Sequence, residues 1–239
     1  WNAIAGIAGL IAGIGIGVWF LYGGFSLGAA RPTPKAAGLV MPLLALAILA
    51  LLFFKPLFGP EGSGPIFFSA KGPGAAHAPI LISLGAGLVV GWLAQRTRFC
   101  TIGAVRDLIM VRDSHLFKGI AAFILAAFVT NMILGQFKAG FEGQPVAHTM
   151  QLWNFLGMVL SGLAFTLAGG CPGRMLIMSG EGDSDAGSFI IGMLVGAAFA
   201  HNFSLASSGA GIGAFGAPAT VIGLVFCLLV GFGFRNRMA

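Results

Sequence analysis

The sequence contains very few charged residues for its length. Only 8% of its 239 residues are Asp, Glu, Lys or Arg, whereas 57% are hydrophobic, and the mean hydropathy is +0.95. Soluble domains carry about 25% charged residues, so this chain lacks the polar side chains that normally cover a water-facing surface. The composition therefore excludes an ordinary soluble domain and indicates a protein that lies within a membrane.

Cysteine is also scarce, and its spacing excludes two classes of protein. The three cysteines are far apart in the sequence and form no C-x-x-C pair: Cys100, Cys171 and Cys227. Neither a disulfide framework nor a metal site is expected from this spacing, and no cofactor is expected. Trp1 stands at the first position and no basic segment precedes the first apolar run, so we expect no signal peptide and a start within a longer gene product.

Glycine, in contrast, is abundant, with 39 residues. These glycines have no three-residue period, which excludes collagen, and they lie among Leu, Ile, Val and Phe. In a bilayer, small residues allow helix backbones to approach one another closely. The net charge of +6 comes from basic residues scattered at the ends of apolar runs, which argues against a nucleic-acid partner. We therefore predict an all-α integral membrane protein in contact with lipid.

The apolar runs predict about seven transmembrane helices. Each spanning helix needs about 20 mostly apolar residues, and seven segments come near this length: 3–23, 38–54, 79–93, 117–136, 152–168, 187–205 and 218–234. Two further segments, 99–113 and 171–183, are too short and too polar to span. We expect them to be re-entrant half-helices that return to the side they left. The Gly- and Pro-rich residues 55–78 are expected to form an extramembrane loop.

The distribution of Lys and Arg predicts the orientation. If the first span starts outside and both half-helices re-enter, three basic residues lie outside: Lys55, Lys71 and Lys138. Ten lie on the other side: Arg31, Lys35, Arg96, Arg98, Arg106, Arg112, Lys118, Arg174, Arg235 and Arg237. The positive-inside rule makes the second side cytoplasmic. We therefore predict a cytoplasmic C-terminus.

A faint internal repeat suggests how the chain is organised. Residues 13–17 (Gly-Ile-Gly-Ile-Gly) followed by 25–27 (Phe-Ser-Leu) resemble residues 192–196 (Gly-Met-Leu-Val-Gly) followed by 203–205 (Phe-Ser-Leu). Coincidence is the alternative for so few glycine-rich matches. Five predicted crossings separate the copies, so they would be inverted, as in many secondary transporters. On this reading residues 1–54 are the last two spans of an upstream repeat, and 79–239 are the C-terminal repeat.

The motif with the most chemical content is Ala-Gly-Gly-Cys-Pro-Gly-Arg at residues 168–174. Gly170 and its neighbour permit a sharp break after an apolar span, and Pro172 suits the first position of a new helix. Cys171 would then lie at the start of a half-helix, where free N–H groups favour anions. Arg174 adds a positive charge one turn later. The alternative is a tight turn that contains an inert cysteine.

A second motif places another cysteine before a short amphipathic segment. Cys100 begins the sequence Cys-Thr-Ile-Gly-Ala-Val-Arg-Asp, which ends with Arg106 and Asp107. Since these last two residues are adjacent, we expect their side chains to point apart on a helix and to need separate partners. Arg96 and Arg98 are interpreted as topology determinants. Cys227 lies in an apolar run and is interpreted as a packing residue.

Acidic residues follow the second half-helix in Ser-Gly-Glu-Gly-Asp-Ser-Asp. Ser184 or Asp185 is expected to cap the next helix. The remaining carboxylates, Glu181 and Asp183, are expected to be solvated or paired with one of the two arginines at 106 and 174.

At these motifs the sequence resembles the YeeE/YedE family of sulphur-compound transporters, and especially the branch called YedE-related selenium metabolism membrane proteins. The resemblance covers most of the chain. It implies a multi-pass protein of a bacterial or archaeal cytoplasmic membrane with two pseudo-symmetric halves, in which cysteines pass the anion along through weak hydrogen bonds. Cys100 and Cys171 match the cysteines of the C-terminal half. No residue matches those of the N-terminal half, so an upstream half or a second chain is expected to complete the pathway.

The leading hypothesis is thus a transporter, not an enzyme, for a small thiosulphate-like or selenium-containing anion. Its expected pathway residues are Gly170, Cys171, Pro172, Arg174, Cys100, Arg106 and Asp107. Two alternatives remain open: a membrane thiol or persulphide sulphur carrier, and a structural subunit of a larger membrane complex.

Overall fold

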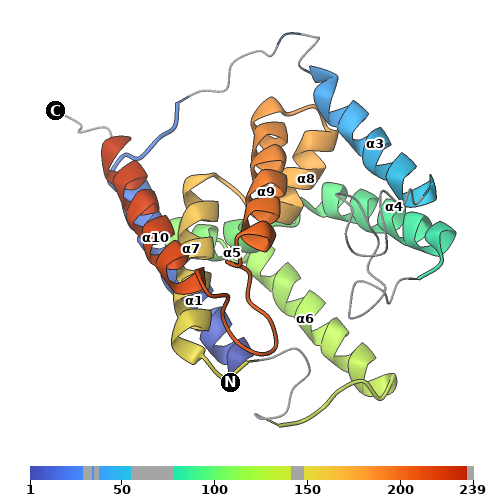
Figure 1. The fold of residues 1–239 in the computed structure, drawn as a ribbon, viewed down its shortest axis with the longest axis horizontal. Coiled ribbons are helices and arrows are strands. Elements are labelled where there is room, and N and C mark those ends of the chain that lie inside the picture. The colour runs from blue at the N-terminus through green and yellow to red at the C-terminus, as the bar shows by residue number, and fades with distance from the viewer. Residues whose placement is uncertain (29–33, 35–37, 55–77, 141–147, 236–239) are drawn as a thin grey trace.

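The computed structural model describes residues 1–28, 34, 38–54, 78–140 and 148–235, and within these ranges the fold is all-helical. The helices are α1 (Asn2–Tyr22), α3 (Val40–Phe54), α4 (Ile80–Thr97), α5 (Thr101–Met110), α6 (His115–Ile133), α7 (Gln151–Leu167), α8 (Pro172–Gly180), α9 (Ser184–Asn202) and α10 (Gly216–Gly233). Figure 1 shows α1, α7 and α10 side by side, with α8 and α9 next to them and α3, α4 and α6 splayed outward.

Each predicted span and each predicted half-helix corresponds to one of these helices. Among the described residues, six helical segments are long and apolar enough to cross a membrane, and two of them, Ile80–Met110 and Gln151–Gly180, join a long helix to the short helix after it. α3 is apolar but shorter. α4 continues past its predicted end at 93 and includes polar residues up to Thr97. It ends at Arg98, which has a left-handed backbone (φ 51°). The predicted loop at 55–78 lies almost wholly outside the described residues, as do Arg31, Lys35, Lys55, Lys71 and Arg237.

The centre of the fold is the pair α1 and α7, which pack backbone against backbone. Gly9 and Gly13 of α1 face the carbonyl groups of Phe155 and Val159, and a Cβ at either glycine would overlap these oxygens. From the other side, Gly162 of α7 faces the backbone of α1 in the same way. Because glycine has no side chain, the helices can approach more closely here than any other residue would allow. The glycine abundance therefore has a structural role.

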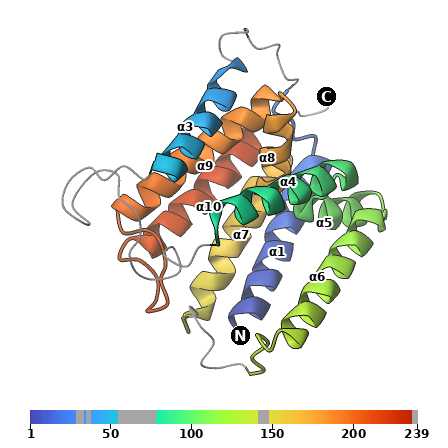
Figure 2. The same cartoon turned by 90° about the vertical axis from the view of Figure 1, so that its right-hand side faces the viewer.

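The directions of the helices follow from the two ribbon views. α1, α7 and α10 start at the end of the bundle that holds Trp1 and run towards the opposite end, whereas α9 runs back (Figures 1 and 2). α8 ends and α9 begins at that opposite end, which α7 also approaches. α1 and α9, which carry the two copies of the faint repeat, are thus antiparallel, as inverted copies would be. The repeat itself stays a prediction.

The outer helices bury almost nothing. α3, α4 and α6 contain no buried residue, although their sequences are apolar on all sides. Large hydrophobic side chains are widely exposed on them, including Phe54 (82%), Leu88 (76%) and Ile133 (79%). In water such surfaces would aggregate, so they are suited to lipid or to further helices. Most of the buried residues lie instead in α1, α5, α7, α8 and the first turns of α9.

Candidate functional site

Cys100 lies at the N-cap of α5, as the sequence predicted for a half-helix led by cysteine. Its backbone is extended (φ −151°, ψ 116°), and its Sγ accepts a hydrogen bond from the Gly103 amide at 3.2 Å. The side chain therefore satisfies one of the amides that a helix start leaves free. The residue is 7% exposed.

Cys171 occupies the same position at the start of α8. Gly169 takes a positive φ of 91°, which turns the chain after α7, and Pro172 is at the first position of the new helix. The Cys171 Sγ accepts a hydrogen bond from the Arg174 amide at 3.4 Å, and the residue is 5% exposed. Gly170 lies against the Met175 side chain, whose Cε would be 3.0 Å from an added Cβ. The predicted break, cap and half-helix are all present.

The two cysteine-led helix starts meet each other, which the sequence alone did not establish. The side chains of Cys100 and Cys171 lie close to each other, and both are free thiols. They share one buried cluster with Ile14 and Val18 of α1 and with Ile102 of α5. The N-termini of α5 and α8, which carry partial positive charge, therefore converge on a pair of sulphur atoms that apolar side chains surround.

The contacts of the two thiols are reciprocal. Cys100 Sγ also lies near the backbone of Cys171, while Cys171 Sγ lies near the backbone and the side chain of Thr101. Each sulphur thus faces donors from its own helix and from the other one. Such a cluster of N–H and O–H donors suits an anion, since helix N-termini carry partial positive charge.

The structure corrects the prediction for Arg106 and Asp107. These neighbours do not point apart to separate partners, because Arg106 Nε lies 2.8 Å from Asp107 Oδ1 in a direct ion pair. The long arginine side chain folds back along the helix to reach the next residue. Both side chains are about one-third exposed, at 31% and 27%. Arg106 therefore offers a partly neutralised positive charge rather than a free one.

Arg174 supplies its amide to Cys171, but its guanidinium points elsewhere. Nη2 lies 3.8 Å from Glu181 Oε2, beyond the far end of α8, so the charge is directed away from the helix start. This agrees with the expectation that Glu181 pairs with an arginine. Among the described residues, Nη1 is buried and has no hydrogen-bond partner.

The cap of α9 is a second correction. Asp183, not Ser184 or Asp185, precedes the helix, and its Oδ1 accepts a hydrogen bond from the Ala186 amide at 2.9 Å. The helix begins at Ser184, which is one or two residues earlier than the predicted caps imply, so the capping position moves with it. Asp185 lies in the first turn instead.

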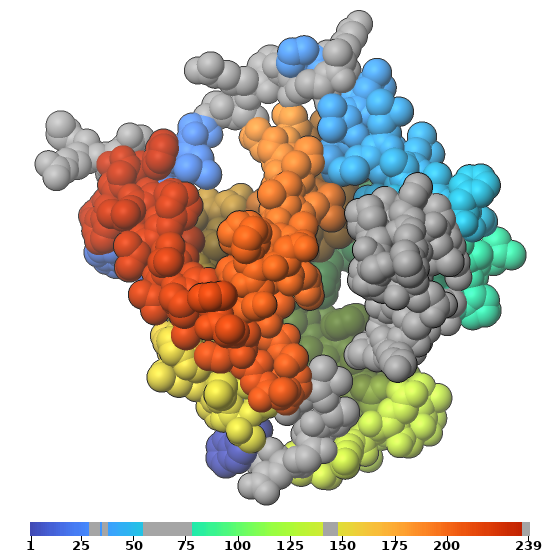
Figure 3. Space-filling model, in the orientation of Figure 1, coloured from blue at the N-terminus to red at the C-terminus, as the bar shows by residue number. Residues whose placement is uncertain are grey.

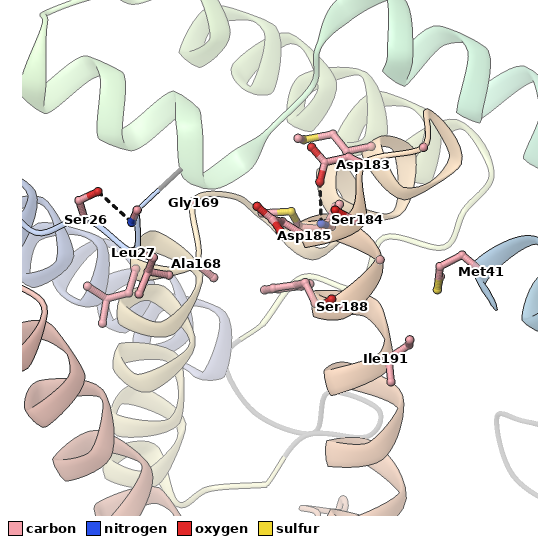
Figure 4. A pocket seen from close by; sticks show the side chains of 18 of the residues that line it. Ser26, Leu27, Met41, Ala168, Gly169, Asp183, Ser184, Asp185, Ser188 and Ile191 are labelled. Carbon is pink, nitrogen blue, oxygen red and sulfur yellow. Dashed lines mark hydrogen bonds between the residues drawn. The ribbon is translucent and has the colours of Figure 1, made fainter. Parts of the chain in front are cut away.

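A pocket of about 1260 Å³ opens beside this site, at the end of the bundle where α9 begins. Figure 3 shows the hollow between α9 and the segment that follows α1, with α7 at its floor. In Figure 4, Leu27, Ala168 and Gly169 border one side, and Asp185 and Ser188 of α9 border the other. Arg106 and Thr166 also line it. The pocket therefore gives access to the region where α7 breaks before Cys171.

Sequence reasoning missed two contributors. α1 was assigned to an upstream repeat, yet Ile14 and Val18 pack directly around the cysteines. Thr101 was not singled out, although its position immediately after a capping cysteine could have shown that its hydroxyl faces the helix start. Cys227 packs against the buried cluster of Phe20, Phe25, Leu163 and Leu167, which is separate from the cluster that holds the cysteine pair, in keeping with its predicted packing role.

Residues 96–227, more than half of the chain, match the protein family described as Sulphur transport. The chain belongs to this family. The YeeE/YedE resemblance stated from the motifs is thereby confirmed. Both cysteine-led helices, the pocket-lining arginine and the break after α7 fall within the matched residues.

Two curated relatives of this sulphur transport protein carry the same name. One is the Thiosulfate transporter TsuA of Escherichia coli (strain K12), 31% identical over 104 residues, or 43% of this chain and 29% of the relative. The other is the Thiosulfate transporter TsuA of Spirochaeta thermophila, 34% identical over 100 residues, or 40% of this chain and 30% of the relative. The aligned part thus spans about three-tenths of each relative's length. No solved structure matches the chain significantly.

These findings decide the broad class of the protein. Its relatives are named as transporters, which agrees with the expectation that the chain is not an enzyme. Family membership and the six membrane-length helical segments together make it a multi-pass membrane protein.

Proposed function

We propose that this chain forms part of a conduction pathway for a small sulphur-containing anion of the thiosulphate type, and that the anion passes between Cys100 and Cys171. One observation carries the proposal: the two thiols meet at the converging N-termini of α5 and α8. The names of the two relatives supply the class of substrate.

The physical basis is a site that attracts an anion without holding it tightly. The helix starts contribute partial positive charge and amide donors, which replace part of the water around the ion. The thiols are weak donors and polarizable acceptors, so they suit a terminal sulphur atom and release it easily. A lysine or arginine in direct contact would bind the anion more strongly and slow its release.

The pocket that opens near the break in α7 serves as a vestibule in this proposal. Arg106 lines it and adds local positive charge, which its ion pair with Asp107 moderates. Asp183 and Asp185 border the opposite side, so the vestibule is not uniformly positive. An anion would therefore be drawn towards the side of the pocket where α5 and α7 lie.

The orientation is part of the proposal. We place the vestibule and the end of α10 on the cytoplasmic side of a bacterial or archaeal cytoplasmic membrane, as the basic residues suggest. Both half-helices then enter from that side. We include selenium-containing analogues among the substrates, since selenium is also soft and polarizable.

We further propose that an upstream half or a second chain completes the wall of the pathway. At Gly13 and Gly17 of α1, an added Cβ would overlap atoms of α7. At the corresponding Gly192 or Gly196 of α9, an added Cβ would meet nothing within 4 Å among the described residues. An inverted copy of α7 would fit this empty face. The unburied surfaces of α4 and α6, next to the cysteine-led helices, support the same arrangement.

Uptake assays on cysteine variants test the proposal. Cys171→Ala and Cys100→Ala in the full-length protein should each lower thiosulphate uptake to background while the protein still inserts into the membrane. Cys227→Ala is the matched control and should be nearly silent, because it changes a packing residue outside the site. Normal uptake by a well-expressed Cys171→Ala variant would overturn the cysteine pathway.

Reconstitution tests the need for a further half. Liposomes that contain residues 1–239 alone should show no thiosulphate flux, whereas addition of the upstream half or partner chain should restore it. Substrate-specific flux from a monomer of this chain alone would contradict the proposal.

A further inference from the structure

We propose that Thr101 determines specificity at the cysteine pair: its hydroxyl donates a hydrogen bond to an oxygen atom of the anion, while the thiols contact the anion's terminal sulphur. This inference rests on the proposed transport function and names how the same site recognises its substrate. Thr101 is the first residue of α5 and directly follows the capping Cys100.

The position of Thr101 leaves its hydroxyl available. Threonines elsewhere in the described helices donate their hydroxyl hydrogen to a carbonyl four residues earlier, at 2.7–2.8 Å: Thr97, Thr130, Thr166 and Thr220. A residue at the first position of a helix has no helical carbonyl one turn behind it. The Thr101 side chain instead lies beside Cys171 of the other half-helix, where the two cysteine-led helix starts meet.

This arrangement places a strong donor beside two weak ones. A thiol is a weak hydrogen-bond donor and acceptor, so Cys171 does not hold the neighbouring hydroxyl tightly. A hydroxyl bonded to a charged oxygen forms a shorter and stronger bond. When the anion enters, the Thr101 hydroxyl can turn from the sulphur to an anionic oxygen without any movement of the backbone.

The chemistry of thiosulphate matches such a mixed site. The ion has one terminal sulphur, which is soft, and three oxygens, and its two negative charges are spread over all four atoms. Amides and a hydroxyl suit the oxygens, whereas thiols suit the sulphur. Of the side chains in contact with the cysteine pair, Thr101 supplies the hydroxyl. Its removal should therefore affect oxygen-bearing anions far more than hydrosulphide, which has no oxygen.

The test measures uptake by the full-length protein in cells that lack other thiosulphate transport. Thr101→Val keeps the size and branching of the side chain but removes the hydroxyl, and it should raise the KM for thiosulphate about tenfold or more. Vmax should change little. Thr101→Ser keeps the hydroxyl and should behave nearly as the wild type. Inhibition of thiosulphate uptake by hydrosulphide should be unchanged in Thr101→Val.

Thr97→Val is the matched control, since it is the same substitution four residues earlier, at a hydroxyl that bonds within α4. It should leave KM unchanged. A wild-type KM in Thr101→Val would overturn the inference. Equal losses in Thr101→Val and Thr101→Ser, or an equal weakening of hydrosulphide inhibition, would also overturn it, because the hydroxyl would not then recognise oxygen. Absence of thiosulphate uptake by the wild-type protein would instead refute the proposed function, and the inference with it.

Discussion

Gly13 of α1 lies so close to the carbonyl oxygen of Val159 in α7 that a methyl group at this position would overlap it. The contact holds α1 against α7, and α1 in turn presents Ile14 and Val18 to the cysteine pair. The geometry of the candidate site therefore depends on a glycine that carries no chemistry of its own.

A comparison of two glycines in α1 tests this dependence. Gly13→Ala should destabilise the folded protein by about 1–3 kcal/mol, because overpacking forces the helices apart. Gly15→Ala is the matched control: an added Cβ there meets nothing within 4 Å among the described residues, so it should be neutral or slightly stabilising. Thermal unfolding in detergent measures both variants. Equal stability of the two variants would show that the close approach is not needed.

Replacement of the site cysteines by serine separates folding from transport. Serine is a preferred N-cap residue and accepts the same amide hydrogen bond, so Cys100→Ser and Cys171→Ser should keep α5 and α8 intact. The oxygen is neither soft nor polarizable, and we expect transport to fall about tenfold or more in each variant. Unfolding temperature and thiosulphate uptake should therefore respond differently. Full uptake by both serine variants would show that the sulphur atoms have no special role.

The cap of α9 can be tested with two neighbouring carboxylates. Asp183→Ala removes the acceptor for the Ala186 amide and should cost about 1 kcal/mol of stability. Asp185→Ala should cost less, because that residue contributes only a favourable charge in the first turn. Thermal unfolding of both variants in detergent decides between them. A larger loss for Asp185→Ala would restore the capping residue that the sequence suggested.

The orientation is open to labelling with a membrane-impermeant maleimide in intact cells. In a background where all three cysteines are Ser, Ser114→Cys and Ser184→Cys should be protected from external reagent, since both follow a half-helix on the proposed cytoplasmic side. Ser207→Cys lies after α9, at the other end of the bundle, and should be labelled. External labelling at 114 and 184 would reverse the topology.

Much of the fold could be predicted from the sequence because the membrane imposes a simple rule. A bilayer offers no partners for backbone polar groups, so each long apolar run becomes a helix. The positions of the helix ends also depend on neighbouring residues. Glycines end α7, and Pro172 begins α8 with Cys171 as its N-cap. Cys100 took the same place before α5. These features depend only on neighbouring residues, and all of them are present in the structure.

Side-chain partners were predicted less well where the competing positions are close in sequence. Arg106 and Asp107 were expected to need separate partners, but the flexible side chain of Arg106 reaches Asp107 at 2.8 Å. The α9 cap moved from 184 or 185 to Asp183 because a shift of one residue changes which side chain faces the free amides. Such choices depend on exact helix boundaries, which a sequence pattern defines only to within a few residues.

A helical membrane bundle with two cysteine-led helix starts follows from the order of residues along the chain. The three-dimensional fold was needed to show that these starts meet, that Thr101 of one helix lies beside Cys171 of the other, and that α1 packs against both cysteines. The reason is physical. Apolar length and helix caps are local properties of the chain, whereas the meeting of α5 and α8 depends on how closely α1 and α7 pack through their glycines.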